Sequence, residues 1–354
     1  MDHQSRGFLA ETRIESPLRA AIFTSLGNVE VQDVPEPSAP KFDEALVRVA
    51  YVGLCGTDLE LFHGSSNYLR TGRTSYPHHF GHEWVGVIDA PPTNPNGEHL
   101  RQGTVVSGST MITCRSCEAC RSGQNNLCSR LREVGLYQYA GAVAEYLTMP
   151  VHSLTVVDNA LDAVPQPRHV LIEPLVTVLE GVAKIEPRVG SRILIIGAGT
   201  IGSLAAIVMS KYPVEVDLID PNGAQQLANL GIARIYSSTS EVNALYDVVW
   251  ECSGAQSATA TLLRNLKPGG VGVLVGVPPA DTTINVAEFA LNGQQLIGIR
   301  HGVDHYITAA EFITKNSEML DNLIDHVYTL ADARQAFARL ETIRERPKVV
   351  LHID

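Results

Sequence analysis

The chain has 354 residues, 45% of them hydrophobic and 18% charged, which suits a globular protein and is long enough for two domains. Its formal net charge is -11, and a surface of this sign repels phosphate backbones and anionic lipids, which argues against nucleic acid and membranes as partners. No apolar run approaches the roughly 18 residues of a membrane-spanning helix, and the polar N-terminus does not resemble a secretory signal. We therefore expect a cytoplasmic protein in which residues 1–17 form a loosely ordered extension.

The first half of the chain has the pattern of an antiparallel, barrel-like β structure. Short β-like runs occupy residues 18–24, 28–34, 44–54, 84–90 and 103–108. Gly, Pro and Asp punctuate these runs, and no long helical period interrupts them.

The pattern changes after about residue 170. Residues 172–185 carry apolar side chains at helical spacing, and the chain then alternates short apolar runs with helix-like stretches. The apolar runs are at 192–196, 214–220, 246–254, 269–277 and 295–299. Apolar strands that alternate with helices indicate a parallel sheet covered on both faces. We therefore predict an α/β fold with a β-barrel part and a doubly wound parallel-sheet part.

A glycine-rich turn directly follows the run at 192–196 and opens a helix. Its residues are Gly197, Ala198, Gly199, Thr200, Ile201 and Gly202. Such glycines permit a tight turn and close approach of a pyrophosphate, and the helix N-terminus offers N–H groups to the phosphates. The turn predicts a dinucleotide site, with a purely structural turn in a fold that binds another ligand as the alternative.

The acid at the end of the next apolar run bears on the choice of dinucleotide. Asp220 is placed to accept hydrogen bonds from the ribose 2′-hydroxyl of NAD and would repel a 2′-phosphate. The next residues, Pro221, Asn222 and Gly223, supply no cation for such a phosphate. NAD is therefore favoured over NADP.

Four of the six cysteines fall on one short segment, as Cys114, Cys117, Cys120 and Cys128. Clustered cysteines in a cytosolic chain of this size favour a metal over disulfides, and four thiolates form the closed set of a structural zinc site. An iron–sulfur cluster and a set of disulfides are the alternatives.

Further metal-binding side chains lie on separate segments: Cys55, His82, Glu83 and Glu173. Each alone has an ordinary interpretation, as a packed thiol, a loop histidine or a carboxylate at a helix start. Together they offer the three protein ligands and the open position that define a catalytic zinc.

The combined motifs resemble the zinc-dependent medium-chain alcohol dehydrogenases, within the polyol, sugar and threonine dehydrogenase branch. The residues that carry the resemblance are CGTD at 55–58, GHEWVG at 81–86, the four clustered cysteines, EPL at 173–175, GAGTIG at 197–202 and ECSGA at 251–255. The resemblance covers about residue 18 to the end.

This resemblance implies a GroES-like catalytic domain made of residues 1–171 and 305–354, with a Rossmann NAD-binding domain at 172–304. It implies that Cys55, His82 and Glu173 hold a catalytic zinc, with Glu83 sometimes replacing a water ligand. It further implies a proton relay that starts at Thr57, with Thr177 near the nicotinamide and Val277 also at the cofactor.

One position departs from the family pattern. Many members carry a relay histidine five residues after the ligand cysteine, where this chain has Glu60, and His63 follows three residues later. Three roles are open for Glu60: it replaces the relay histidine, it contacts the metal or the substrate, or it faces solvent. The isolated Cys252 is expected to pack in the Rossmann core.

The expected activity is hydride transfer between NAD and a polar secondary alcohol, such as a polyol, a sugar or an aminocyclitol, with threonine 3-dehydrogenase-like oxidation as the alternative. Candidate substrate contacts are Asn67, Tyr68, Arg300 and His301. Other interpretations are a zinc- and NAD-binding regulator without turnover, and a zinc-free reductase or structural member. A homodimer or homotetramer is expected, because the strands at 269–277 and 295–299 can pair across a two-fold axis.

Overall fold

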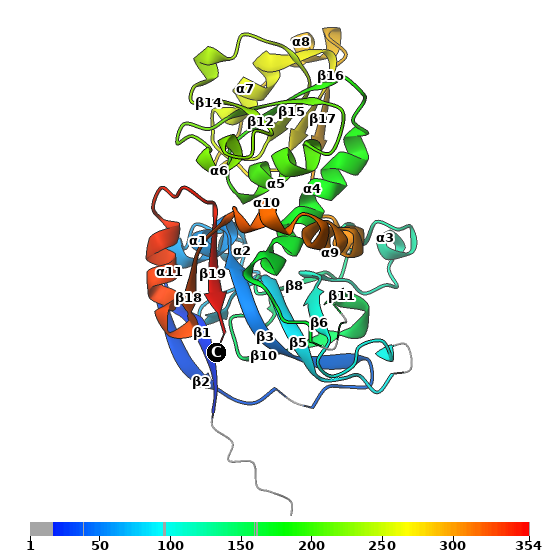
Figure 1. Cartoon of the computed structure of the whole chain (residues 1–354), viewed down its shortest axis with the longest axis vertical. Coiled ribbons are helices and arrows are strands. Elements are labelled where there is room, and N and C mark those ends of the chain that lie inside the picture. The colour runs from blue at the N-terminus through cyan, green and yellow to red at the C-terminus, as the bar shows by residue number, and fades with distance from the viewer. Residues whose placement is uncertain (1–16, 38, 95–96, 159, 161, 354) are drawn as a thin grey trace, which may run out of the picture.

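The computed structural model describes residues 17–37, 39–94, 97–158, 160 and 162–353, so nearly all of the expected N-terminal extension, residues 1–16, lies outside the described residues. Figure 1 shows an elongated molecule with a six-stranded parallel sheet at one end and mainly antiparallel sheets at the other. Helices α4 (Ile172–Ile185), α9 (Tyr306–Lys315) and α10 (Ser317–Asp321) lie between these two parts (Figure 1).

The part nearer the N-terminus consists mainly of strands and short helices. Its strands are β1 (Leu18–Ser25), β2 (Asn28–Val34), β3 (Glu44–Leu54), β4 (His78–His79), β5 (Glu83–Ala90), β6 (Val105–Gly108), β7 (Met111–Ile112), β8 (Arg132–Val134), β9 (Gln138–Tyr139), β10 (Tyr146–Pro150) and β11 (Leu154–Asp158). Its helices are α1 (Gly56–His63), α2 (Asn67–Arg70) and α3 (Glu118–Arg121).

The rest of the chain alternates strands with helices. Its strands are β12 (Arg192–Ile196), β13 (Glu215–Ile219), β14 (Arg234–Tyr236), β15 (Tyr246–Glu251), β16 (Leu266–Leu274), β17 (Gln295–Gly298), β18 (Ile324–Thr329) and β19 (Lys348–His352). The further helices are α5 (Thr200–Met209), α6 (Gln225–Ala228), α7 (Ala258–Asn265), α8 (Val286–Leu291) and α11 (Ala333–Leu340).

The predicted parallel sheet is confirmed. Within the described residues it has six strands in the order β14-β13-β12-β15-β16-β17, and every neighbouring pair is parallel. The strand order reverses direction beside β12, the strand that leads into the glycine turn, and such a switch point is where open α/β sheets bind ligands. The sheet therefore presents the turn at the expected place for a dinucleotide.

The other main sheet joins distant parts of the chain. In the described residues it follows the order β11-β6-β5-β3-β19-β18, with β10 also paired to β3. The C-terminal strand β19 pairs antiparallel with β3, Val350 opposite Gly53. This pairing brings residues near the end of the chain next to the segment that leads into Cys55.

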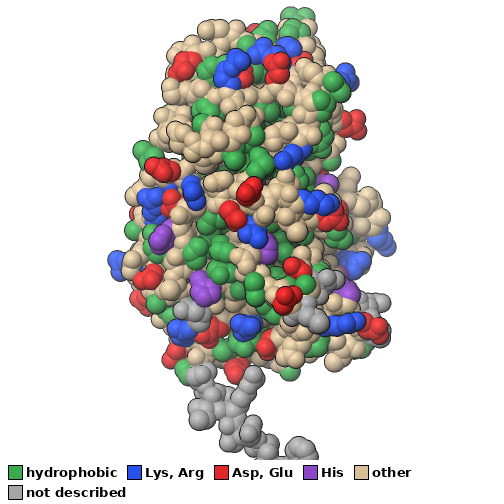
Figure 2. All heavy atoms as spheres, viewed as in Figure 1, with side chains coloured by type: hydrophobic (Ala, Val, Ile, Leu, Met, Phe, Trp, Pro, Cys, Tyr) green, Lys and Arg blue, Asp and Glu red, His purple; other side chains and the backbone are tan. Residues whose placement is uncertain are grey.

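Each part has its own apolar core. Phe23, Phe80 and Phe337 pack together in the first, so that helix α11 closes the β-rich part. In the second, α4, α5 and α9 pack with the parallel sheet. Figure 2 shows acidic and basic side chains interspersed over the visible face. In the described chain, no helix is both long and apolar enough to cross a membrane.

Candidate active site and metal centres

Three metal-binding side chains converge at the end of β3. Cys55, His82 and Glu83 offer a sulfur, a nitrogen and an oxygen that all lie within 4.8 Å of one another, and Cys55 Sγ is 3.1 Å from His82 Nε2. Sulfur, imidazole nitrogen and carboxylate oxygen are the donors that zinc takes in proteins. The set fits a zinc ion with a position left over for another ligand.

Local structure holds the first two of these donor side chains. Cys55 is the N-cap of α1, where its Sγ accepts a hydrogen bond from the Thr57 amide at 3.2 Å. Asp58, which is fully buried, accepts from the Cys55 amide at 3.0 Å and lies 3.5 Å from His82 Nδ1. A carboxylate behind a histidine fixes the ring so that its other nitrogen faces the metal. Asp58 is therefore a positioning residue to which the sequence pattern gave no role.

The third donor side chain of this set, Glu83, has a buried cation behind it. Lys348 of β19 is fully buried and donates from Nζ to Glu83 Oε2 at 2.5 Å and to the Leu54 carbonyl at 3.2 Å. A Cβ at Gly53 would come 2.3 Å from Glu83 Oε2, so this glycine of β3 leaves the space that the carboxylate occupies. Sequence reasoning missed Lys348, whose only signal is a lysine at the start of the apolar run KVVLHI.

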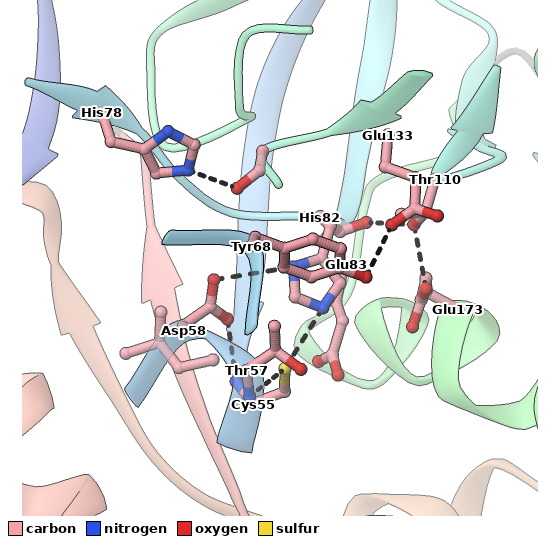
Figure 3. Close-up of polar contacts among 12 residues, drawn as sticks. Cys55, Thr57, Asp58, Tyr68, His78, His82, Glu83, Thr110, Glu133 and Glu173 are labelled. Atoms are coloured by element: carbon pink, nitrogen blue, oxygen red, sulfur yellow. Dashed lines mark hydrogen bonds and ion pairs between the residues drawn. The ribbon is translucent and has the colours of Figure 1, made fainter. Parts of the chain in front are cut away.

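Glu173 lies in a neighbouring hydrogen-bond network. Its Oε1 accepts from the Thr110 hydroxyl at 2.9 Å (Figure 3) and also lies 3.2 Å from His301 Nε2. Burial alone would raise the pKa of the Glu173 carboxyl, but the hydrogen bond and charge of His301 outweigh it and lower that pKa. Glu173 is therefore held as an anion beside the zinc-binding set, outside the compact group of three donors.

Electrostatics around the three donors favours a cation. Burial raises the pKa of the Cys55 thiol, and burial opposes charge on His82 while Cys55 and Asp58 raise its pKa well above the ordinary value. Without a metal, burial therefore favours the protonated thiol at Cys55 and the charge of its neighbours favours a protonated His82. A dication supplies the positive charge directly and leaves the thiol deprotonated.

The residues predicted to relay the proton lie on one helix, and the further residues predicted to contact the cofactor lie elsewhere. Thr57 lies in the first turn of α1, while Glu60 is exposed and His63 Nε2 lies 2.5 Å from Glu341 Oε1. Thr177 is buried in α4, and the Val277 side chain is exposed.

The glycine turn has the shape that a pyrophosphate needs. Gly197 has a φ of 99°, a left-handed conformation that suits glycine, and a Cβ at Gly202 would come 1.8 Å from the Gly197 carbonyl oxygen. A Cβ at Gly199 would meet nothing within 4 Å, so the turn is open on that side. Asp220 receives a hydrogen bond from the Ala198 amide at 2.7 Å, which fixes its carboxylate beside the turn, and Thr200 and Ile201 begin α5.

The four clustered cysteines form a second compact set. Their sulfurs lie within 4.8 Å of one another, with 3.9 Å between Cys114 and Cys120 and 3.9 Å between Cys117 and Cys128. Tetrahedral zinc with Zn–S bonds of about 2.3 Å would separate its sulfurs by about 3.8 Å. The spacing therefore fits one tetrahedral ion.

Backbone amides favour thiolates in this set. Hydrogen bonds from the Ser116 and Cys117 backbone lower the pKa of Cys114 to about 5, and the amides of Cys114 and Arg130 point to Cys128 Sγ at 3.3 and 3.4 Å. All six cysteines lie in the described part of the chain and carry free thiols, so the disulfide alternative is wrong for this structure. Cys252 is partly buried among the residues that pack against the Rossmann core.

Comparisons with known proteins agree with this architecture. The chain matches the alcohol dehydrogenase GroES-like domain at residues 41–159 and the glucose dehydrogenase C-terminus at residues 168–353. It is 26% identical over 355 residues to sorbitol dehydrogenase of Bacillus subtilis, covering 95% of this chain and 97% of the relative. It is 27% identical to L-threonine 3-dehydrogenase of Chromobacterium violaceum, covering 88% of this chain and 93% of the relative.

A solved structure extends the likeness to the whole fold. A dehydrogenase of Sinorhizobium meliloti bound to NADP superposes with a TM-score of 0.85 at 25% identity, covering 96% of this chain and all of that one. The second family model alone spans more than half of the present chain. The chain therefore belongs to the zinc-dependent medium-chain alcohol dehydrogenases, as its sequence motifs predicted.

Proposed function

We propose that the chain catalyses the reversible oxidation of a polar secondary alcohol, such as a polyol, a sugar or an aminocyclitol, to a ketone with NAD. The observation that carries this proposal is the compact donor set of Cys55, His82 and Glu83 in a chain that also has an open dinucleotide turn. Two relatives are named for sorbitol and L-threonine, and each of these compounds carries a secondary hydroxyl among other polar groups.

Cys55, His82 and Glu83 would hold the catalytic zinc, and the four clustered cysteines a structural one. The compactness of the three donors supports Glu83 as the third ligand, with Glu173 held nearby as an anion. When bound, zinc supplies a Lewis acid that lowers the pKa of an alcohol, and the nicotinamide supplies the hydride acceptor.

The protein's own groups would move the proton and orient the reactants. Thr57 Oγ1 is the first proton acceptor in this proposal, since Thr57 follows the ligand cysteine in the first turn of α1. Glu60 lies three residues further on the same helix and is exposed, so its carboxylate can pass the proton to solvent. Thr177 and Val277 would contact the cofactor.

The choice of NAD over NADP rests on Asp220. Its Oδ2 accepts from the Ala198 amide at 2.7 Å and its Oδ1 from the Asn222 amide at 2.8 Å, so the carboxylate is fixed beside the glycine turn, which supports a contact with the ribose of a bound dinucleotide. Repulsion between this carboxylate and that phosphate favours NAD. The value of kcat/KM for NAD should exceed that for NADP, and Asp220→Ala should reduce the ratio.

An NAD-reduction screen tests the activity. The panel holds polyols, sugars, aminocyclitols and L-threonine, and zinc is measured on the same sample. Turnover of a polyol or aminocyclitol supports the proposal, whereas turnover of L-threonine alone supports the threonine 3-dehydrogenase alternative. NADH binding without turnover of any alcohol by the zinc-loaded protein would favour a regulatory protein.

A homodimer or a homotetramer is also proposed. Strand β17 is the last strand of the parallel sheet within the described residues, so its outer edge can pair with a second copy. Light scattering coupled to gel filtration distinguishes a monomer, a dimer and a tetramer.

A further inference from the structure

A buried carboxylate that no motif indicates lies beside the zinc-binding set. Glu133 of β8 is 2% exposed, and its two oxygens accept from the Tyr68 hydroxyl at 2.9 Å, the Tyr137 hydroxyl at 3.3 Å and Arg300 Nη2 at 3.2 Å. These partners come from α2, from the turn after β8 and from the segment that follows β17. A buried carboxylate needs such donors because its desolvation is costly.

The cluster adjoins the proposed reaction site. In Figure 3 the Tyr68 ring lies in front of His82, and its hydroxyl points toward Glu133, which lies next to Thr110. The Thr110 hydroxyl in turn donates to Glu173 at 2.9 Å. Tyr68 and Glu133 therefore form one wall beside the metal-binding side chains.

The hydrogen bonds within the cluster do not use all of its acceptors and donors. A carboxylate has about four lone-pair positions, and the described residues fill three of them at Glu133. Tyr68 donates its single proton to Glu133, so its oxygen can still accept. The Arg300 side chain is 42% exposed and has about five N–H donors, so it can donate outward as well.

On the side of the cluster away from His82, arginines lie close to the Glu133 carboxylate and its tyrosine partner. Arg300 pairs with Glu133 directly, and the Arg73 guanidinium lies over the Tyr137 ring, 5.3 Å from its centroid. Toward His82 the cluster presents Tyr68, whose oxygen is an acceptor backed by an anion. That arrangement suits a neutral group that donates one hydrogen bond and accepts another, as an alcohol hydroxyl does.

We infer that Glu133 and Tyr68 form a specificity site for a hydroxyl group on the carbon next to the reacting carbon. The hydroxyl donates to the Tyr68–Glu133 pair and accepts from Arg300. This inference rests on the proposed function and narrows its substrate class to vicinal diols within polyols, sugars and cyclitols. In this inference Glu133 and Tyr68 determine substrate specificity and do not bind zinc.

A matched pair of probes, 2,3-butanediol and 2-butanol, tests the inference, because the two differ in the neighbouring hydroxyl. The wild type should prefer the diol, and Glu133→Gln should reduce the diol/2-butanol ratio of kcat/KM about tenfold, as expected for loss of one hydrogen bond to a charged group. The change should appear mainly in KM for the diol, with 2-butanol nearly unaffected. Tyr68→Phe, which removes one hydroxyl from a partly buried ring, should reduce the same ratio if Glu133→Gln does not fold.

Two readouts on the same samples separate the possible failures. Zinc content and Tm show whether each variant is intact, and the rise in Tm that each probe causes in the presence of NADH reports binding without turnover. An unchanged diol preference in both intact variants would overturn the inference. If no alcohol reduces NAD, the proposed function fails, and the diol-dependent rise in Tm still decides the role of Glu133 and Tyr68.

Discussion

The two proposed metal-binding sets of this protein are built in opposite ways. The four cysteines lie between residues 114 and 128 on one surface segment, and three of the four are only partly buried. Cys55, His82 and Glu83 come from two separate segments, and a third, distant one supplies the buried Lys348 behind them. The first set depends on local sequence, and the second exists only when the whole β-rich part has folded.

This difference assigns different tasks to the two sets. A closed set of four thiolates leaves no position for a substrate, so it is suited to holding a loop in place. A three-donor set with buried positioning residues leaves a position and fixes the geometry around it. Loss of the first should therefore reduce stability, and loss of the second should abolish turnover.

Removal of a ligand from the three-donor set should have the largest effect. Cys55→Ala or His82→Ala should lower kcat/KM by about 1,000-fold or more, equivalent to about 4 kcal/mol of transition-state stabilisation, because the Lewis acid is lost. Zinc content should fall by one equivalent per chain while the circular dichroism spectrum is retained. Wild-type turnover with undiminished zinc would remove these residues from the catalytic site.

The buried ion pair between Glu83 of this set and Lys348 should give the next largest effect. Lys348→Met leaves Glu83 buried without its cation, which should cost about 3–5 kcal/mol of unfolding free energy in the zinc-free protein. Added zinc should recover part of this loss if Glu83 is a ligand. Urea titrations with zinc and with a chelator measure both quantities.

A double variant is the control for that experiment. Glu83→Gln with Lys348→Met removes both charges, so the zinc-free double variant should be more stable than Lys348→Met alone. Equal stability of the two zinc-free variants would mean that the Glu83 charge is not what Lys348 compensates.

The same contrast explains how much the sequence could predict. The four-cysteine set and the glycine turn are contiguous, so their spacing alone predicts a zinc site and a dinucleotide site, and the alternation after residue 170 predicts the parallel sheet. Lys348 could not be placed beside Glu83 before the pairing of β19 with β3 was known. Glu133 likewise looks like an ordinary strand residue until Tyr68 and Arg300 are brought to it.

A change in the four-cysteine set should affect stability more than chemistry. Cys117→Ser should remove the structural zinc and lower the unfolding free energy by about 1–3 kcal/mol, the range of a usual destabilising substitution, because the segment is local and partly exposed. The value of kcat for the protein that remains folded should stay within about threefold of the wild type, well short of the effect expected at a catalytic group. Thermal unfolding and zinc content measure the first effect. An unchanged Tm would exclude a structural role.

Acid should weaken the fold through a residue outside both sets, His169. This histidine is 7% exposed, its Nδ1 accepts from the Gln166 amide at 3.2 Å, and burial, with the charge of Arg168, lowers its pKa from 6.5 to about 4. The unfolded chain binds the proton more tightly, so the stabilisation is complete above pH 6.5 and is lost as pH falls toward about 4. Between these values the unfolding free energy should fall by on the order of 1 kcal/mol per pH unit.

The control variant is His169→Gln, which keeps an acceptor for the Gln166 amide and does not titrate, so its stability should depend less on pH. Because acid also releases zinc from thiolates, zinc content must be measured at each pH, and an equal acid loss in both proteins at constant zinc content would rule His169 out.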